Sequence, residues 1–142
     1  MTDKIFIDTN IIVYDYLQND FDKHIKAKNF INSLIDKEIF ISTQVLSETY
    51  SVLKRNDIDN ANAKYYIEYC IEKYNILPIT LNDIKTCLKI RDSQNYSYWD
   101  CLILSTAINN NCVYVYSEDM QHKHIVYAGL QVINPMYKRE EQ

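Results

Sequence analysis

The sequence predicts an α/β protein built on a central parallel sheet of four to five strands. Short apolar runs, typical of buried strands, alternate with longer segments of helical periodicity, and this alternation favours parallel strands joined by helices. The expected strands are 4–8, 39–42, 76–79, 112–116 and 130–133, and the expected helices are 10–18, 22–37, 43–55, 59–74, 81–94 and 98–110.

The first strand ends in polar residues. The run KIFI at 4–7 is short and apolar, as in strands buried on both faces, and Asp8, Thr9 and Asn10 follow it. Open α/β sheets bind ligands outside the carboxyl ends of their strands, so an acid at position 8 is placed for chemistry. The alternative is structural, because these residue types also lead at the N-caps of helices.

The boundaries between the middle elements come from turn residues and one proline. Asn19-Asp20 and the segment 55–57 read as breaks between consecutive helices. Pro78 cannot donate a ladder hydrogen bond, so it confines its strand to an edge or an end of the sheet.

Two acids interrupt the apolar stripes of expected helices. Glu48 lies three residues after Val45 and four before Val52, on one helical face. Asp100 shares a face with apolar residues of the helix 98–110. Buried carboxylates are rare unless they are paired or bind metal, so both positions suggest a site. A partly exposed Glu48, or a capping box between Ser97 and Asp100, would need no function.

A second strand also ends in acids. The run CVYVY at 112–116 leads through Ser117 and Glu118 to Asp119. Asp119 alone is an ordinary turn residue. Because a parallel sheet brings the ends of its strands to one edge, the sequence predicts that Asp8 and Asp119 meet there.

Composition indicates one domain over residues 1–137, with a frayed tail at 138–142. The 142 residues are 47% hydrophobic, and no apolar run is long enough for a membrane span. The amino terminus shows no export signal, so we expect a cytoplasmic protein. Four cysteines without a Cys-x-x-Cys spacing are expected to be reduced core residues, and the single glycine excludes a phosphate-binding glycine loop.

The net charge of the chain does not indicate a nucleic-acid ligand. The chain carries 15 Lys plus Arg against 19 Asp plus Glu, a net charge of −4, whereas nucleic-acid binders are usually basic. Bound divalent ions would reverse the field of an acidic site. Lys54 and Arg91, with Arg55 and Lys89, are the basic residues that we would test for RNA contact, although a solvated helical face is the alternative for each.

The chain resembles the PIN-domain ribonucleases of the VapC toxin type. The matching segments are DTN at 8–10, QVLSE at 44–48, YWDCLI at 98–103, SEDMQH at 117–122 and VINP at 132–135. They occur in the order of the family and span almost the whole chain. Lys123 is a departure, since related chains often have glycine there, and it puts the local turn in doubt.

The resemblance implies a PIN-like three-layer α/β/α fold and a metal-dependent endoribonuclease. Asp8, Glu48, Asp100 and Asp119 would hold Mg²⁺ or Mn²⁺ and form the catalytic site, because hard cations select oxygen ligands. Supporting residues would be Thr9, Asn10 and Ser117. Glu118 should point away from Asp119. Asp15 is expected to be an exposed helical acid, and the alternative is an extra acid near the site.

The same resemblance implies the toxin of a type II toxin–antitoxin pair, with an RNA substrate, a small antitoxin protein and a homodimeric state. Three alternatives stay open: a PIN-like nuclease of RNA maturation, a non-catalytic RNA- or protein-binding domain, and a phosphoacceptor domain. The last should carry a lysine after its final core strands, and SED at 117–119 offers none. His122 and His124 have no third ligand at zinc spacing, so we expect a solvent-facing loop there.

Overall fold

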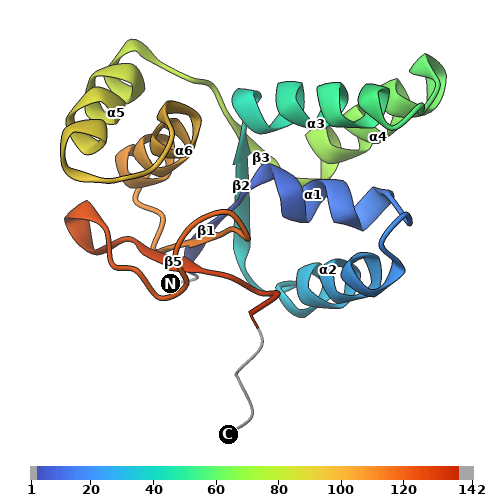
Figure 1. Ribbon diagram of the computed structural model, residues 1–142, viewed down its shortest axis with the longest axis horizontal. Helices are drawn as coiled ribbons and strands as arrows, with labels where there is room; N and C mark the ends of the chain where they lie inside the picture. The colour runs from blue at the N-terminus through green and yellow to red at the C-terminus, as the bar shows by residue number, and fades with distance from the viewer. Residues whose placement is uncertain (1–2, 138–142) are drawn as a thin grey trace, which may run out of the picture.

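The computed structural model describes residues 3–137, in which helices cover both faces of a five-stranded sheet (Figure 1). The strands are β1 (Lys4–Ile7), β2 (Glu38–Ser42), β3 (Asn75–Leu77), β4 (Tyr114–Tyr116) and β5 (Gln131–Ile133). The helices are α1 (Thr9–Tyr16), α2 (Phe21–Ser33), α3 (Thr43–Arg55), α4 (Asn60–Lys73), α5 (Leu81–Ser93) and α6 (Tyr98–Asn109), with a 3₁₀ turn at Tyr127–Gly129. The predicted tail at 138–142 lies outside the described residues.

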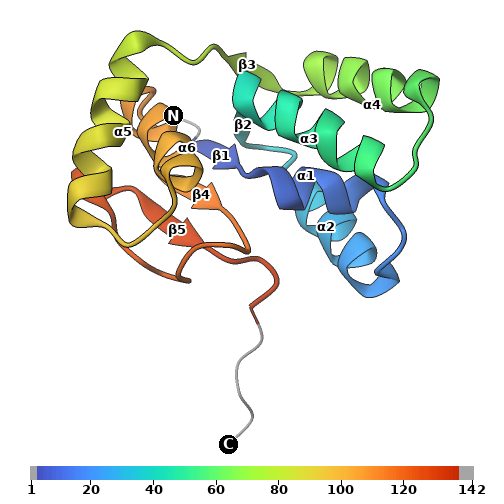
Figure 2. The ribbon, with the colours of Figure 1, turned by 45° about the horizontal axis from the view of Figure 1, so that its top comes forward.

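The sheet is entirely parallel, as predicted, with the strand order β3-β2-β1-β4-β5. The chain first builds outward from β1 through β2 to β3, and then crosses to β4 on the other side of β1. Helices α1 to α4 lie on one face of the sheet and α5 and α6 on the other, so the three-layer α/β/α expectation is confirmed (Figure 2). The strand order therefore reverses between β1 and β4, and the carboxyl ends of these strands flank the crevice where such sheets bind ligands.

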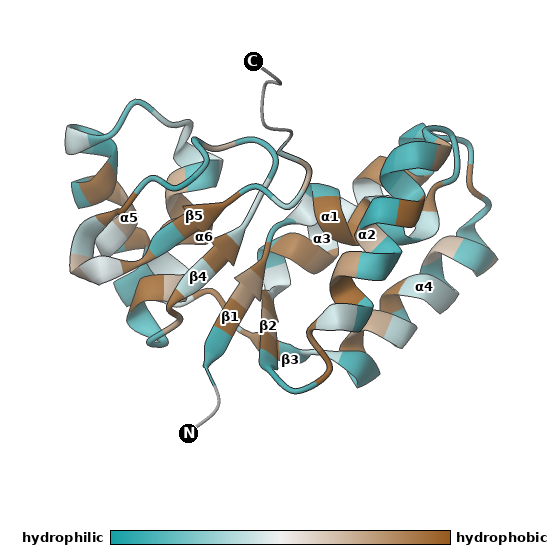
Figure 3. Ribbon diagram, turned by 90° about the horizontal axis from the view of Figure 1, so that it is seen from below, coloured by the Kyte–Doolittle hydropathy of each residue, from teal (hydrophilic) through white to brown (hydrophobic). Residues whose placement is uncertain are grey.

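The centre of the core is β1. Ile5, Phe6 and Ile7 are each at most 1% exposed because helices cover both faces of this strand (Figure 3). Pro78 directly follows β3, an edge strand, as predicted. All four cysteines are buried free thiols, which confirms that expectation. Within residues 3–137, none of the helices combines the length and the apolar character needed to cross a membrane.

Four predicted boundaries were wrong by two residues or more. The first helix ends at Tyr16 rather than at 18, and β3 ends at Leu77 rather than at 79. The second helix ends at Ser33 rather than at 37, because a tight turn with Leu34 N–H donating to Ile31 O redirects the chain toward β2. The strand β4 begins at Tyr114 rather than at 112, because Cys112 N–H still donates to Ala107 O at the end of α6. All of these differences fall at the ends of elements, which local sequence patterns define least well.

Candidate metal centre

Asp8 lies at the end of β1 and is also the N-cap of α1, so both sequence interpretations hold. Its side chain is oriented by two donors. Asp8 Oδ1 accepts from Thr9 N–H at 2.7 Å, and Asp8 Oδ2 accepts from Ser117 Oγ–H at 2.7 Å. The backbone N–H of Asp8 donates to Tyr116 O at 2.9 Å, which ties the end of β1 to the end of β4. Asp8 is only 4% exposed, so its carboxylate has a fixed position.

Asp119 reaches the same place from β4. Ser117 follows that strand directly and is fully buried, and its Oγ accepts from Asp119 N–H at 3.1 Å while donating to Asp8. One hydroxyl therefore positions two of the predicted acids. Asp119 itself is exposed.

Asp100 enters from the other layer, in the first turn of α6. Ser97 caps this helix, and its Oγ accepts from Asp100 N–H at 3.1 Å. The predicted capping role of Ser97 is thus present, and it coexists with a half-buried carboxylate aimed at the end of the sheet. The cap places Asp100 at the helix N-terminus, where the helix dipole favours negative charge.

The three aspartates form one group. Asp8, Asp100 and Asp119 each offer a carboxylate oxygen, and these oxygens lie within 4.8 Å of one another. Three convergent oxygen ligands are the chemistry that Mg²⁺ and Mn²⁺ prefer, so the residues present fit such an ion. Asp100 on α6 and Asp119 after β4 lie about 90 residues or more beyond Asp8 in the chain, so they meet Asp8 only in the fold.

Convergence of like charges perturbs the acids. The pKa of Asp8 is raised to about 7, chiefly by burial and to a smaller extent by the charges of Asp100 and Asp119, against the hydrogen bonds from Ser117 and Thr9, which lower it. Burial also raises the pKa of Asp100, followed by the charge of Asp119, while a hydrogen bond with Ser97 acts in the opposite direction. Without a cation, therefore, the group resists full ionisation.

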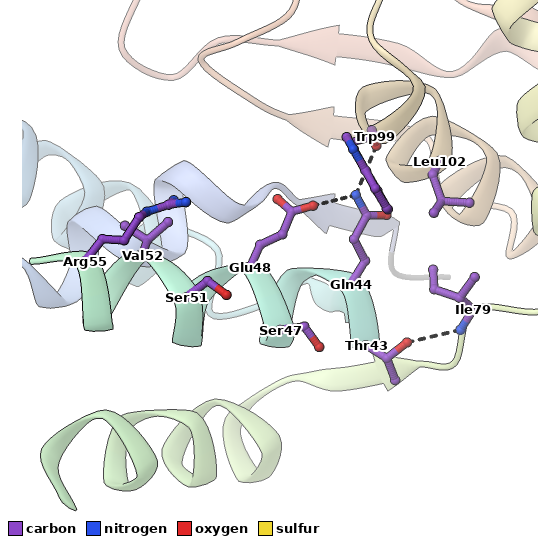
Figure 4. A pocket seen from close by; sticks show the side chains of 10 residues that line it. All are labelled: Thr43, Gln44, Ser47, Glu48, Ser51, Val52, Arg55, Ile79, Trp99 and Leu102. Carbon is purple, nitrogen blue, oxygen red and sulfur yellow. Dashed lines mark hydrogen bonds between the residues drawn. The ribbon is translucent and has the colours of Figure 1, made fainter. Parts of the chain in front are cut away.

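Glu48 stands beside this group rather than in it, among the residues that the structure describes. Its Oε2 accepts from Thr9 Oγ–H at 3.1 Å, and its Oε1 accepts from Gln44 Nε2 at 2.7 Å (Figure 4). Thr9 donates its N–H to Asp8 and its hydroxyl to Glu48, so it links the fourth predicted acid to the first. The prediction that Glu48 lies on an inward-facing stripe is matched by its half-buried side chain.

The other predicted site residues differ in burial and in their hydrogen-bond partners. The side-chain amide of Asn10 is buried and has no hydrogen-bond partner within residues 3–137. Lys54 donates to Ile58 O at the turn after α3, and Arg91 is exposed in the last turn of α5. Arg55, rather than Lys54, lines the cavity that reaches Glu48.

The expectation for Asp15 was wrong. Asp15 is 7% exposed, and its Oδ1 lies 3.3 Å from Lys28 Nζ while its Oδ2 accepts from Tyr66 O–H at 3.3 Å. The side chain is buried because α2 and Tyr66 of α4 cover this side of α1, a tertiary arrangement without a local signal. Its partners identify a structural acid outside the three-aspartate group.

Glu118 points away from the aspartate group, as expected, and it has a role that the sequence did not reveal. Its Oε1 accepts from Tyr14 O–H at 2.8 Å and pairs with Lys23 Nζ at 2.9 Å. These partners belong to α1 and α2, so the residue next to Asp119 is tied to the opposite helical layer. Nothing in the local sequence links Lys23 to position 118.

The two loop histidines are not solvent-facing, which corrects that expectation. His122 Nδ1 accepts from Asn134 N–H at 3.0 Å and its ring stacks on Tyr137, and His124 Nδ1 lies 2.6 Å from Tyr96 Oη. Both are half-buried and hold the connection between β4 and β5 in place. Lys123 between them has φ +65°, in the left-handed region that favours glycine.

The model of the PIN domain family matches residues 5–126. The chain belongs to the PIN domain family. A comparison with curated protein sequences finds no significant match.

Solved structures share this PIN fold. VapC20 of Mycobacterium tuberculosis, described as a toxin that cleaves the sarcin–ricin loop, is 21% identical over 81% of this chain and 89% of its own, with a TM-score of 0.69. A toxin–antitoxin complex from Klebsiella pneumoniae is 19% identical over 92% of this chain and 97% of its own, with a TM-score of 0.68. VapBC2 of Rickettsia felis bound to promoter DNA is 17% identical over 91% of this chain and 96% of its own, with a TM-score of 0.69.

Proposed function

We propose that this PIN-domain chain is a Mg²⁺- or Mn²⁺-dependent endoribonuclease that hydrolyses RNA phosphodiester bonds. The observation that carries the proposal is the convergence of Asp8, Asp100 and Asp119 within 4.8 Å at the reversal point of the sheet. These three aspartates would hold the cation, and Glu48 would act from the adjacent position. A divalent ion at such a site lowers the pKa of bound water and stabilises negative charge on phosphate oxygens.

The chain's own residues prepare the site before any ion binds. Thr9 N–H and Ser117 Oγ–H fix both oxygens of Asp8, so little conformational freedom is lost when a ligand arrives. Ser117 fixes Asp119 through the same hydroxyl. The raised pKa of Asp8 means that ion binding displaces a proton from the group around neutral pH.

Glu48 acts as the general base that accepts the proton of the attacking water. Thr9 and Gln44 each donate to one of its oxygens and hold the carboxylate at the edge of the aspartate group. As water attacks phosphorus in line, Glu48 accepts its proton, and the bond from phosphorus to the 3′ oxygen breaks. The products are a 5′-phosphate and a 3′-hydroxyl, the latter formed when the leaving oxygen takes up a proton from solvent.

We propose further that the nuclease is the toxin of a type II toxin–antitoxin pair and acts in the cytoplasm as a homodimer. The PIN fold that it shares with the Klebsiella pneumoniae and Rickettsia felis complexes supports this reading. The partner would be a small antitoxin protein that covers the acidic site. Co-expression with the product of a short upstream reading frame should yield a stable complex without nuclease activity, whereas an uncomplexed active enzyme would favour a role in RNA maturation.

The experiment that tests the metal centre is a calorimetric Mn²⁺ titration of the metal-stripped protein, followed by incubation with RNA. We expect binding and cleavage in the wild type, and neither in Asp8→Asn/Asp100→Asn. The matched control is Asp36→Asn/Asp92→Asn, which removes two exposed carboxylates elsewhere and should behave as wild type. Absence of Mn²⁺ binding in the wild type would overturn the proposal in favour of a non-catalytic binding domain.

A further inference from the structure

A cavity of about 680 Å³ runs along α3 beside the proposed metal centre. Its walls are α3, the first turns of α6 and the segment that follows β3 (Figure 4). We call it the α3 groove and define it by Gln44, Glu48, Arg55, Trp99 and Leu102. None of the roles given above to the aspartates uses this surface.

The α3 groove is continuous with the metal centre. Glu48 and Val52 line it and also line a second cavity of about 370 Å³, which contains Asp119. Trp99 of the groove is the direct chain neighbour of Asp100. A polymer with one phosphate at the aspartate group would therefore pass into the groove.

An exposed aromatic ring lies at one end. Trp99 is 61% exposed although it belongs to a helix that is otherwise almost wholly buried from Cys101 to Ala107. This exposure leaves an aromatic ring available at the lining of the groove. An exposed indole ring can serve as a stacking platform for an unpaired base.

A cation lies at the other end. Arg55 is exposed in the last turn of α3, eleven residues after Gln44, which places the two roughly 16 Å apart along the helix axis. That span accommodates a short stretch of single strand. A guanidinium binds phosphate oxygens with two parallel hydrogen bonds.

Beside Trp99, at the same end of the groove, is an unused acceptor. Gln44 is 8% exposed, and its Nε2 donates both to Glu48 Oε1 at 2.7 Å and to Trp99 O at 3.0 Å. Both partners are acceptors, which fixes the orientation of the amide. Its Oε1 then accepts no hydrogen bond within residues 3–137. A buried acceptor without a donor is unfavourable, and a ligand N–H or O–H can remove that cost.

We propose that the α3 groove binds the RNA strand next to the scissile phosphate, with a base stacked on Trp99 and a phosphate held by Arg55. This inference rests on the proposed function and deepens it, because it requires an unpaired rather than a duplex substrate. Gln44 Oε1 accepts from the ligand, and since every base edge and every ribose offers a donor, it adds affinity without a base preference. The combination of an indole and a cation beside the metal centre favours RNA over a peptide as the occupant.

The chain carries its own probe of this site, because Trp99 is its only tryptophan. Tryptophan fluorescence is recorded during titration with a single-stranded oligoribonucleotide in EDTA, where a metal-dependent nuclease does not cleave. We expect quenching by the single strand, little quenching by a duplex, and none by an oligomer of the same length with abasic sites. Unchanged fluorescence at saturation, measured with a labelled oligomer, would overturn the proposal.

Single substitutions measure the contribution of each end of the groove to RNA binding. By fluorescence anisotropy of a labelled oligomer, Trp99→Leu should bind about tenfold more weakly or worse. Arg55→Gln should weaken binding and lower the salt slope by about 0.7. The matched controls are Tyr65→Leu and Lys85→Gln, an exposed aromatic and an exposed cation away from the groove, and both should bind as wild type. Unchanged melting temperatures would show that all four variants are folded.

The outcomes distinguish this inference from the nuclease proposal. Quenching by RNA in a protein that fails to bind Mn²⁺ supports the groove and overturns the nuclease. Mn²⁺-dependent cleavage with Trp99→Leu equal to wild type in affinity and rate overturns the groove alone. If Trp99→Leu and Arg55→Gln instead lose a co-expressed protein partner and keep RNA affinity, the groove is a protein-docking surface and the inference fails.

Discussion

Asp8 and Asp119 belong to one carboxylate group but are held in opposite ways. Asp8 is 4% exposed at the end of the central strand, with both oxygens bound by neighbouring donors. Asp119 is exposed on a bent connection after β4, and the contact that positions it is a backbone hydrogen bond to Ser117. The end of the sheet and the cap of α1 fix the first acid, whereas the second is held through its backbone and through the contacts of its neighbour Glu118. The side of the proposed metal centre with Asp8 is therefore rigid, and the side with Asp119 is accessible to solvent.

The largest expected difference between the two acids is in metal affinity. Asp8→Asn should reduce Mn²⁺ affinity by about a hundredfold or more, because it removes a charge from the oriented, buried ligand. Asp119→Asn should cost about tenfold, because water can take the place of an exposed ligand. Calorimetry on the metal-stripped proteins measures both values, and an equal or larger loss in Asp119→Asn would contradict this division.

The pH dependence of stability should identify Asp8. Its pKa rises from 3.8 to about 7 on folding, so between these values the folded state holds a proton that the unfolded state has lost. The free energy of unfolding of the metal-free protein should therefore fall as pH rises from 4 to 7, by about 4 kcal/mol. The raised pKa of Asp100 adds a change of the same sign.

Urea denaturation at several pH values in EDTA measures this slope. Asp8→Asn should remove most of the loss and should be more stable than wild type at pH 8. Asp36→Asn, at an exposed site, should retain the wild-type slope. A wild-type protein that becomes more stable from pH 4 to pH 7 would show that Asp8 ionises normally.

A smaller effect should come from the contacts behind Asp119. Lys23→Met removes the ammonium that pairs with Glu118 and, in that pairing, has a raised pKa. With Glu118 less firmly held, Mn²⁺ affinity should fall about three- to tenfold, as for other residues that orient ligands indirectly. Lys23→Arg should restore most of the affinity, and Lys85→Met on α5 should have no effect. Equal affinities in all variants would show that Ser117 alone positions Asp119.

The smallest effect should arise in the loop beyond Asp119. Lys123 adopts φ +65°, so Lys123→Gly should relieve backbone strain and raise the free energy of unfolding by up to about 1 kcal/mol. Lys123→Ala keeps a Cβ and should bring no such gain. Mn²⁺ affinity should stay unchanged in both, and a change there would mean that this turn, too, determines the position of Asp119.

The local features of the fold could be read from the sequence because they depend on nearby residues. The apolar run before Asp8, the cap at Ser97 and Pro78 after an edge strand each follow from short-range patterns. The inward position of Glu48 follows from helical spacing. The misplaced boundaries lie at the ends of α1, α2 and β3 and at the start of β4, where the chain passes between an element and a connection.

The burial and the partners of residues that contact a different layer of the fold could not be predicted from the sequence. Asp15 was expected to be exposed but is buried under α2 and α4, and the tie between Lys23 and Glu118 spans 95 positions. The loop histidines were expected in solvent because their partners, Asn134 and Tyr96, belong to other segments. Periodicity shows which face of an element is apolar, and it does not show which element covers that face.

The sequence by itself therefore determined the α/β class, the order of the elements and the acids at their ends, because propensity, periodicity and capping act over a few residues. The tertiary structure alone decided that β4 lies beside β1, that Ser117 bonds to Asp8 across 109 positions, and that Trp99 and Arg55 share one groove. Strand order is set by packing energies between distant segments, which have no counterpart in any local pattern. The proposed metal centre exists only where those packing energies bring the acids together.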